Sequence, residues 1–193
     1  RSDGHTLWMH KDNLEGQNWR RGEGNLFSNV KKVYLDPSKS EIIKLICNNS
    51  NPAVEIPDDS KMVKRVRIKS KLLSDFWGQP MYLGATVLLP DGYDENPDEF
   101  YPVNYQHGHF SLGVPFGFRD PDAPSASSRR SNQEFTDFWM SDDCPPLIAI
   151  KILHPCPYYD DSYAVNSPNV GPYDDAIAQE LIPLLEEKFR IIS

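Results

Sequence analysis

Residues 147–153 constrain the fold more than any other segment, because six of their seven side chains are apolar and only Lys151 is charged. A strand with one wet face alternates apolar and polar residues. A continuous apolar run of this length is typical of a central strand that is covered on both faces. We therefore predict a central strand over 147–153 in an α/β fold.

The segments around this run predict further layers of the same sheet. We expect a short strand over 101–106, a helix over 132–140 with Phe135, Phe138 and Trp139 on one face, and a new strand beginning at Ile191. A helix over 174–189 places Ile177, Leu181, Leu184 and Leu185 on one face. Such alternation implies right-handed crossovers and predicts that 101–106, 147–153 and 190 onward are parallel neighbours.

The ends of the helix over 174–189 carry recognisable signals. Pro172 suits the first turn, and Asp174 and Asp175 place negative charge where the helix dipole is positive. Pro183 lies inside the helix and should kink it, because proline has no backbone N–H.

Two segments before the central run alternate in the manner of a hairpin. We predict antiparallel strands over 62–73 and 81–89, joined by a turn at 77–80.

The basic residues between 61 and 71 alternate with apolar ones, as on the wet face of a strand. With a formal net charge of −8, the sequence favours no nucleic-acid partner.

The first 60 residues differ from the rest, because they are rich in Asn, Asp, Gly and Ser and have short apolar stretches at 30–35 and 42–47. Both stretches are predicted as strands. We expect a β-rich N-terminal domain or arm over 1–60 and a second unit over 61–193.

Membrane, metal and cofactor functions have little support. No apolar run approaches the ~20 residues that span a bilayer. The three cysteines have no C-x-x-C spacing, and His107 with His109 lacks a third ligand at a fixed spacing. We predict no membrane contact, no metal and no cofactor.

Asn48 in Asn48-Asn49-Ser50 is the candidate glycosylation site and points to a secreted or extracellular protein.

Three segments resemble a known family. Residues 101–108, YPVNYQHG, resemble the strand YPVxYxxHG, and 85–93, ATVLLPDGY, resemble a strand that ends in P-x-G-Y. The segment 174–190, with ELIP and FR, is similar to a helix ELIPxxExxFR. The family is the putative-esterase family of the α/β-hydrolases, which includes enterochelin esterase-like proteins, feruloyl esterases and mycolyltransferases. The likeness covers about 60–193.

The resemblance implies part of an α/β-hydrolase sheet. In such enzymes the loop after the third core strand donates a backbone N–H to the oxyanion, which makes Gly108, His109 and Phe110 the oxyanion-loop candidates. The family's nucleophile elbow, G-x-S-x-G, follows the strand after the ELIP helix, and this sequence contains no such motif. The resemblance thus implies the N-terminal half of a hydrolase domain, with no catalytic residue in this chain. We expect its sheet to be completed by a C-terminal continuation or another chain.

A loop after the central run combines aromatic and acidic side chains. Its candidates for contact with an acyl-ester substrate are Tyr159, Asp160, Asp161 and Tyr163, although a solvated surface loop is an alternative interpretation. The function implied by the resemblance is part of a serine hydrolase that cleaves an ester or related acyl bond. The alternatives are a non-catalytic binding or interaction module and a degenerate hydrolase scaffold.

Overall fold

The computed structural model describes residues 24–40, 42–52, 56–107, 113–122, 130–157 and 162–192. Its strands are β1 (Leu26–Ser28), β2 (Cys47–Ser50), β3 (Val63–Ser70), β4 (Met81–Leu88), β5 (Val103–His107), β6 (Ile148–Leu153), β7 (Asn166–Ser167) and β8 (Gly171–Pro172). Its helices are α1 (Lys71–Trp77), the 3-10 turn η1 (Pro115–Gly117), α2 (Arg130–Trp139), α3 (Tyr173–Ala176), the π-helical turn η2 (Ile177–Leu181) and α4 (Ile182–Lys188).

The main sheet is mixed and has the strand order β3-β4-β6-β5. Strand β6 runs parallel to β5 and antiparallel to β4, so the predicted central strand and its parallel neighbour are confirmed. Beyond β5, Ile191 forms a single parallel bridge with Tyr101, as expected for the start of a further strand. The chain therefore folds as an α/β protein around this sheet.

The predicted antiparallel pairing of β3 and β4 is confirmed, but the prediction for the segment that joins them is wrong. The strands pair antiparallel from Val63 opposite Leu88 to Ser70 opposite Met81. Residues 71–73, predicted to extend the strand, instead begin helix α1. The helix starts at Ser70, whose Oγ accepts the N–H of Leu73, and ends at Gly78, which adopts a left-handed conformation (φ 65°).

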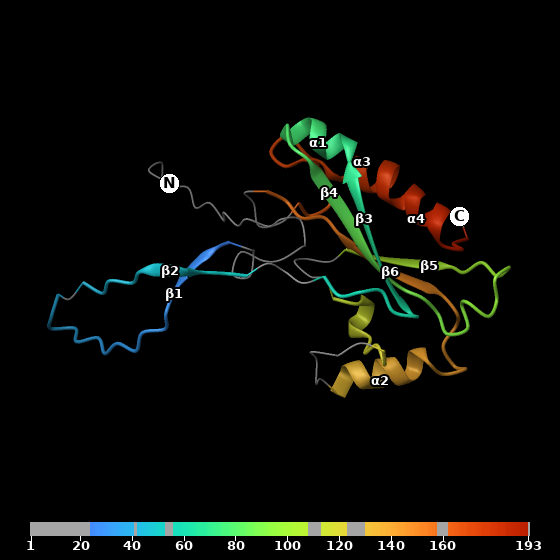
Figure 1. Cartoon of the computed structure of the whole chain (residues 1–193), viewed down its shortest axis with the longest axis horizontal. Coiled ribbons are helices and arrows are strands. Elements are labelled where there is room, and N and C mark those ends of the chain that lie inside the picture. The colour runs from blue at the N-terminus through green and yellow to red at the C-terminus, as the bar shows by residue number, and fades with distance from the viewer. Residues whose placement is uncertain are drawn as a thin grey trace.

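Helices cover both faces of the sheet (Figure 1). Helices α1, α3 and α4 lie on one face, over a core that contains Leu83, Ile150 and Leu181. Helix α2 lies on the other face, where Trp139 packs with a smaller apolar group that includes Met62. Phe138 of α2 remains 47 % exposed, so its predicted place on the buried face is wrong; the narrower buried stripe is centred on Trp139.

The predicted helix over 174–189 forms as α3, η2 and α4 in succession. The acidic first turn is confirmed with Asp174 and Asp175. The expected effect of Pro183 takes the form of a π turn: the N–H of Ile182 donates to the carbonyl of Ile177, five residues earlier. Since proline cannot donate a hydrogen bond, the turn before it has to rearrange.

The strands predicted at 30–35 and 42–47 are wrong in position. Strands β1 and β2 pair antiparallel at 26–28 and 47–50, and the predicted stretches between them have no assigned strand partner among the described residues. Their β-branched side chains favour extended backbone, but a strand also requires a neighbour. Among the described residues, no helix is long and apolar enough to cross a membrane.

Candidate functional site

The parallel pairing of β5 and β6 brings their carboxyl ends to one edge of the sheet. His107 ends β5 opposite Ile152 of β6, and His154 follows β6 directly. The two imidazole rings lie with centroids 5.8 Å apart. His107 is exposed and His154 is 6 % exposed. In open α/β sheets, ligands bind beyond this edge, which makes it the candidate site.

A buried serine completes the arrangement around His154. The Oγ atom of Ser162 lies 2.8 Å from Nδ1 of His154 and 3.2 Å from the carbonyl oxygen of the same residue. It also accepts the N–H of Ala164 at 3.1 Å. A hydroxyl has one proton, so Ser162 donates either to the carbonyl or to Nδ1. Only the second state places the imidazole as a proton acceptor for the serine, as a general base would be.

The turn after Ser162 has a strained backbone. Tyr163 and Ala164 both adopt left-handed conformations, with φ of 51° and 52°. Non-glycine residues seldom do so, and such conformations persist only where surrounding contacts fix them. Here Ser162, 1 % exposed, anchors the turn from inside, while Tyr163 is 66 % exposed. The serine is therefore held deep in the loop, and the tyrosine is turned outward.

Two further contacts fix the loop that carries the site to the body of the protein. The hydroxyl of Tyr173 donates to the carbonyl of Pro155 at 2.5 Å, and the indole N–H of Trp77 donates to the carbonyl of Val170 at 3.0 Å. Both donors come from helices on the same face of the sheet. The ends of the loop are thereby held in place next to β6.

The phenol of Tyr105 lies on β5, two residues before His107. Burial raises its pKa, and the charge of Glu186 raises it further. The Oη atom is buried and has no hydrogen-bond partner among the described residues. This phenol therefore stays neutral through physiological pH and is not positioned to accept a proton there.

The predicted site residues fall partly outside the described residues. Gly108, His109 and Phe110 immediately follow His107 but lie outside the described residues, as do Tyr159, Asp160 and Asp161. Tyr163 is described and lies at the candidate site, exposed. Asn48 is exposed on β2, in the N-terminal part of the chain.

The sequence pattern did not predict that His154 and Ser162 lie next to each other. The available signal was a histidine directly after the central strand, at the edge where sites form. The serine eight residues later gave no signal, because its approach depends on the two left-handed residues that follow it.

In the described part of the chain, no three or more His, Cys, Asp or Glu side chains form a group that could hold a metal ion. A cavity of about 260 Å³ lies at the opposite edge of the sheet, lined among others by Pro90, Trp139 and Leu147. Because Leu147 precedes β6, this cavity is separate from the edge that carries His107 and His154.

Comparison with known proteins gives a distant likeness. The sequence matches no protein-family model and no curated protein. Among solved structures, a ferulic acid esterase aligns with a TM-score of 0.45 and 20% sequence identity. The alignment covers 68% of this chain and 46% of that chain, so this chain spans less than half the length of that protein.

Proposed function

We propose that this chain is part of an esterase-type α/β-hydrolase domain and contributes the oxyanion loop to its active site. One observation carries the proposal. Strand β5 is the third strand of the main sheet in chain order, and its carboxyl end lies beside that of β6. In α/β-hydrolases the loop that follows the third strand donates a backbone N–H to the oxyanion.

In this proposal, Gly108, His109 and Phe110 are the donor positions, and Tyr163 with Tyr159, Asp160 and Asp161 borders the acyl-ester substrate. Backbone N–H groups stabilise a developing alkoxide because they already point at the charge when it forms. The sequence holds no G-x-S-x-G, so the proposed nucleophile and its triad partners come from other polypeptide. His107 is exposed at the same edge, and in this proposal it borders the leaving group.

A second candidate is a nucleophile within this chain, and the 2.8 Å contact between Ser162 Oγ and His154 Nδ1 favours it. A serine and a histidine at this distance form the basic unit of nucleophilic catalysis. The burial of Ser162 opposes this reading, since an ester carbonyl has to reach the hydroxyl. We therefore place the Ser162–His154 pair second, as a contact that fixes the loop.

One experiment separates the two candidates. The natural protein is treated with a serine-directed fluorophosphonate and digested, and the labelled peptide is identified by mass spectrometry. We expect the label on a serine outside residues 1–193, and neither labelling nor aryl-ester hydrolysis by the 193-residue chain alone.

Each other outcome decides between the alternatives. Label on Ser162 that is abolished by Ser162→Ala, but not by the control Ser167→Ala, would establish the second candidate. A natural protein that is neither labelled nor active on aryl esters would refute both candidates and leave a binding module or a degenerate scaffold.

A further inference from the structure

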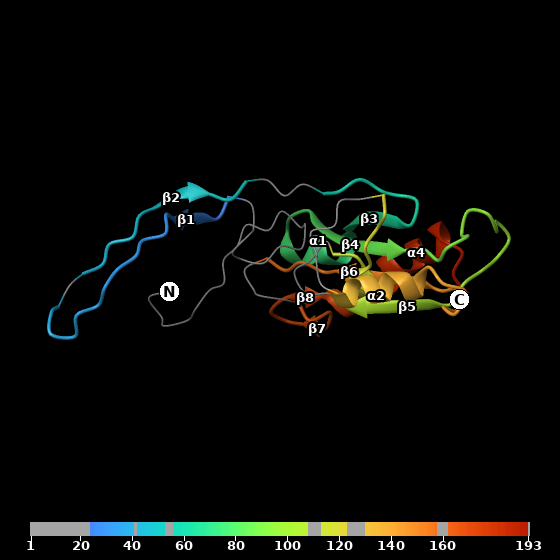
Figure 2. The same cartoon turned by 90° about the horizontal axis from the view of Figure 1, so that it is seen from below.

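The N-terminal residues 24–40 and 42–52, called the arm here, extend away from the sheet and its helices. Figures 1 and 2 show this from two perpendicular directions. Strands β1 and β2 pair at the base, and a turn closes the tip, where the N–H of Lys39 donates to the carbonyl of Asp36 at 3.0 Å. Between base and tip, the two segments have extended, β-prone sequences but no assigned strand partner among the described residues.

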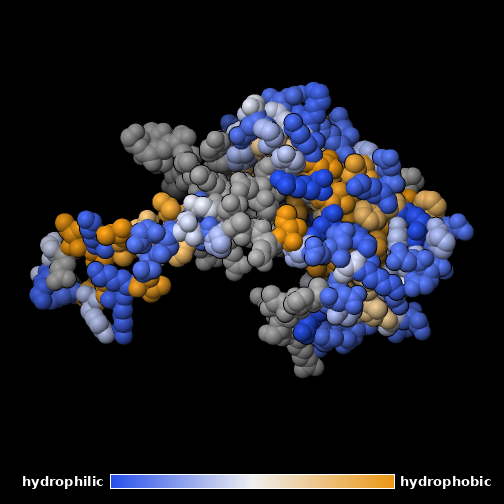
Figure 3. Space-filling model, in the orientation of Figure 1, coloured by the Kyte–Doolittle hydropathy of each residue, from blue (hydrophilic) through white to orange (hydrophobic). Residues whose placement is uncertain are grey.

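Large apolar side chains of the arm are exposed to solvent. Val30 and Ile42 have exposed fractions of 102% and 97%. The other large exposed apolar side chains of the arm are Leu26, Phe27, Val33, Tyr34, Leu35, Ile43, Leu45 and Ile46. Figure 3 shows the apolar side chains along the arm. A concentration of exposed apolar side chains on one part of a protein is a feature of interaction surfaces.

The arm is also basic, whereas the rest of the chain is acidic. Residues 24–52 contain four lysines and two carboxylates, so of the chain's net charge of −8 the remaining residues carry −10. Like charges therefore disfavour contact between two arms, and opposite charges favour contact between an arm and the acidic part of the protein.

A loop over residues 91–100, called the acidic loop here, has the complementary character. Its five carboxylates are exposed: Asp91, Asp94, Glu95, Asp98 and Glu99. Of these, only Glu95 forms an ion pair within the described residues, with Lys61 at 2.9 Å. The loop ends at Phe100, which is 60 % exposed. It thus offers both negative charge and an apolar side chain.

The arm and the acidic loop of one chain lie at opposite ends of the molecule. Both perpendicular views show the loop that leads into β5 at the end remote from the arm. An arm therefore cannot contact the acidic loop of its own chain in this structure. The acidic loop of a second copy has the charge that is complementary to the arm.

We propose that this chain forms a two-fold dimer in which the arm of each copy contacts the acidic loop of the other. In a two-fold dimer the same contact occurs twice, once from each arm, and this closes the assembly. The proposal is independent of the proposed esterase function.

Mass measurement tests the assembly. In light scattering coupled to size-exclusion chromatography at low salt, we expect a dimer of about twice the chain mass of 22.1 kDa. High salt should weaken the dimer, because the charged groups are exposed and are screened by salt. A monomer at all concentrations and at low salt would overturn the proposal.

Cross-linking tests which surfaces meet. Unlabelled and ¹⁵N-labelled chains are mixed and treated with a carbodiimide, which joins lysines to carboxylates in direct contact. We expect mixed-label peptides that join Lys31, Lys32, Lys39 or Lys44 to the carboxylates of the acidic loop. Cross-links found only within one copy would overturn the proposal, as would intermolecular cross-links that join other surfaces.

Variants of exposed residues complete the test. Val30→Ser with Ile42→Ser should raise the dimer dissociation constant at least tenfold, whereas the control Phe138→Ser, on the exposed part of α2, should leave it unchanged. Lys31→Glu with Lys44→Glu should also weaken the dimer, and adding Asp94→Lys with Asp98→Lys should restore it. Circular dichroism confirms that each variant is folded. Failure of the charge swap to restore the dimer would overturn the assigned contact.

Discussion

A row of polar residues crosses the sheet on the face that α2 covers. Register places Arg65 beside Thr86, Thr86 beside Lys151, and Lys151 beside Gln106. Thr86 is fully buried, and within the described ranges its hydroxyl has no hydrogen-bond partner. Burial lowers the pKa of Lys151. The ammonium group of Lys151 is therefore partly desolvated in the folded chain.

We predict that Lys151→Met stabilises the chain by about 1 kcal/mol at pH 7, because it removes a partly desolvated charge. The folded chain disfavours the protonated amine, so between the lowered pKa and the ordinary 10.5 the unfolded chain binds more protons. Stability should consequently rise with pH through this window in the parent and not in the variant. Urea unfolding at several pH values measures this, with Lys69→Met on exposed β3 as control. An equal pH slope in parent and Lys151→Met would contradict the prediction.

The sequence pattern of the central strand predicts its burial well, because continuous apolar character depends on the residues themselves. The site depends on contacts that no local pattern contains. His154 is fixed by the strand before it, but Ser162 reaches it only because Tyr163 and Ala164 adopt left-handed conformations that their types disfavour. Composition and spacing therefore located the edge of the sheet without identifying the buried pair.

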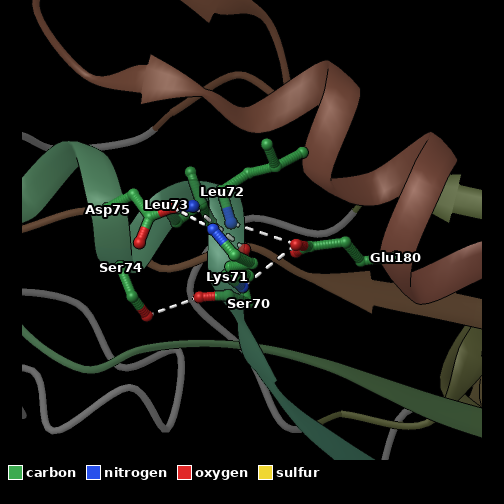
Figure 4. A network of polar contacts seen from close by, with 7 residues as sticks. All are labelled: Ser70, Lys71, Leu72, Leu73, Ser74, Asp75 and Glu180. Atoms are coloured by element: carbon green, nitrogen blue, oxygen red, sulfur yellow. Dashed lines mark hydrogen bonds and ion pairs between the residues drawn. The ribbon is translucent and has the colours of Figure 1, made fainter.

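Helix α1 also depends on contacts that its local sequence does not reveal. Its first two N–H groups, of Lys71 and Leu72, both donate to Oε1 of Glu180 at 3.0 Å, as Figure 4 shows. Glu180 lies in the π turn η2, more than 100 residues later in the chain. With Ser70 accepting the third N–H, the helix start is satisfied, but most of the cap comes from outside the local sequence. A helix capped in this way is not apparent from residues 62–80 alone.

We predict that Glu180→Ala destabilises the chain by about 1–2 kcal/mol, the usual cost of losing a helix cap. Glu180→Gln should cost less, because an amide oxygen still accepts both N–H groups while the favourable charge at the helix start is lost. Urea unfolding measures both, with Glu187→Ala on the exposed face of α4 as control. The assigned role of Glu180 would be wrong if Glu180→Ala and Glu187→Ala behaved alike.

The whole molecule combines a packed α/β body with an arm that has little packing of its own. The change in composition at about residue 60 predicts two units, 1–60 and 61–193, and this division stays a prediction. What composition could not supply was the position of the arm's strands, since pairing at the base leaves the β-prone middle segments without partners. The large apolar residues of the two predicted strands lie on the surface.

This organisation predicts the order in which a protease cuts the chain. Cleavage requires local opening, which is easiest where backbone hydrogen bonds and buried contacts are few. In dilute protein, trypsin should therefore cut at Lys31, Lys32, Lys39 and Lys44 before it cuts at lysines in the main sheet, such as Lys64 and Lys151. Mass spectrometry of a time course gives the order of cuts, and circular dichroism of the cut protein should show the body still folded. Early cleavage at Lys151, or loss of the body's signal as soon as the arm is cut, would show that the arm and the body unfold as one unit.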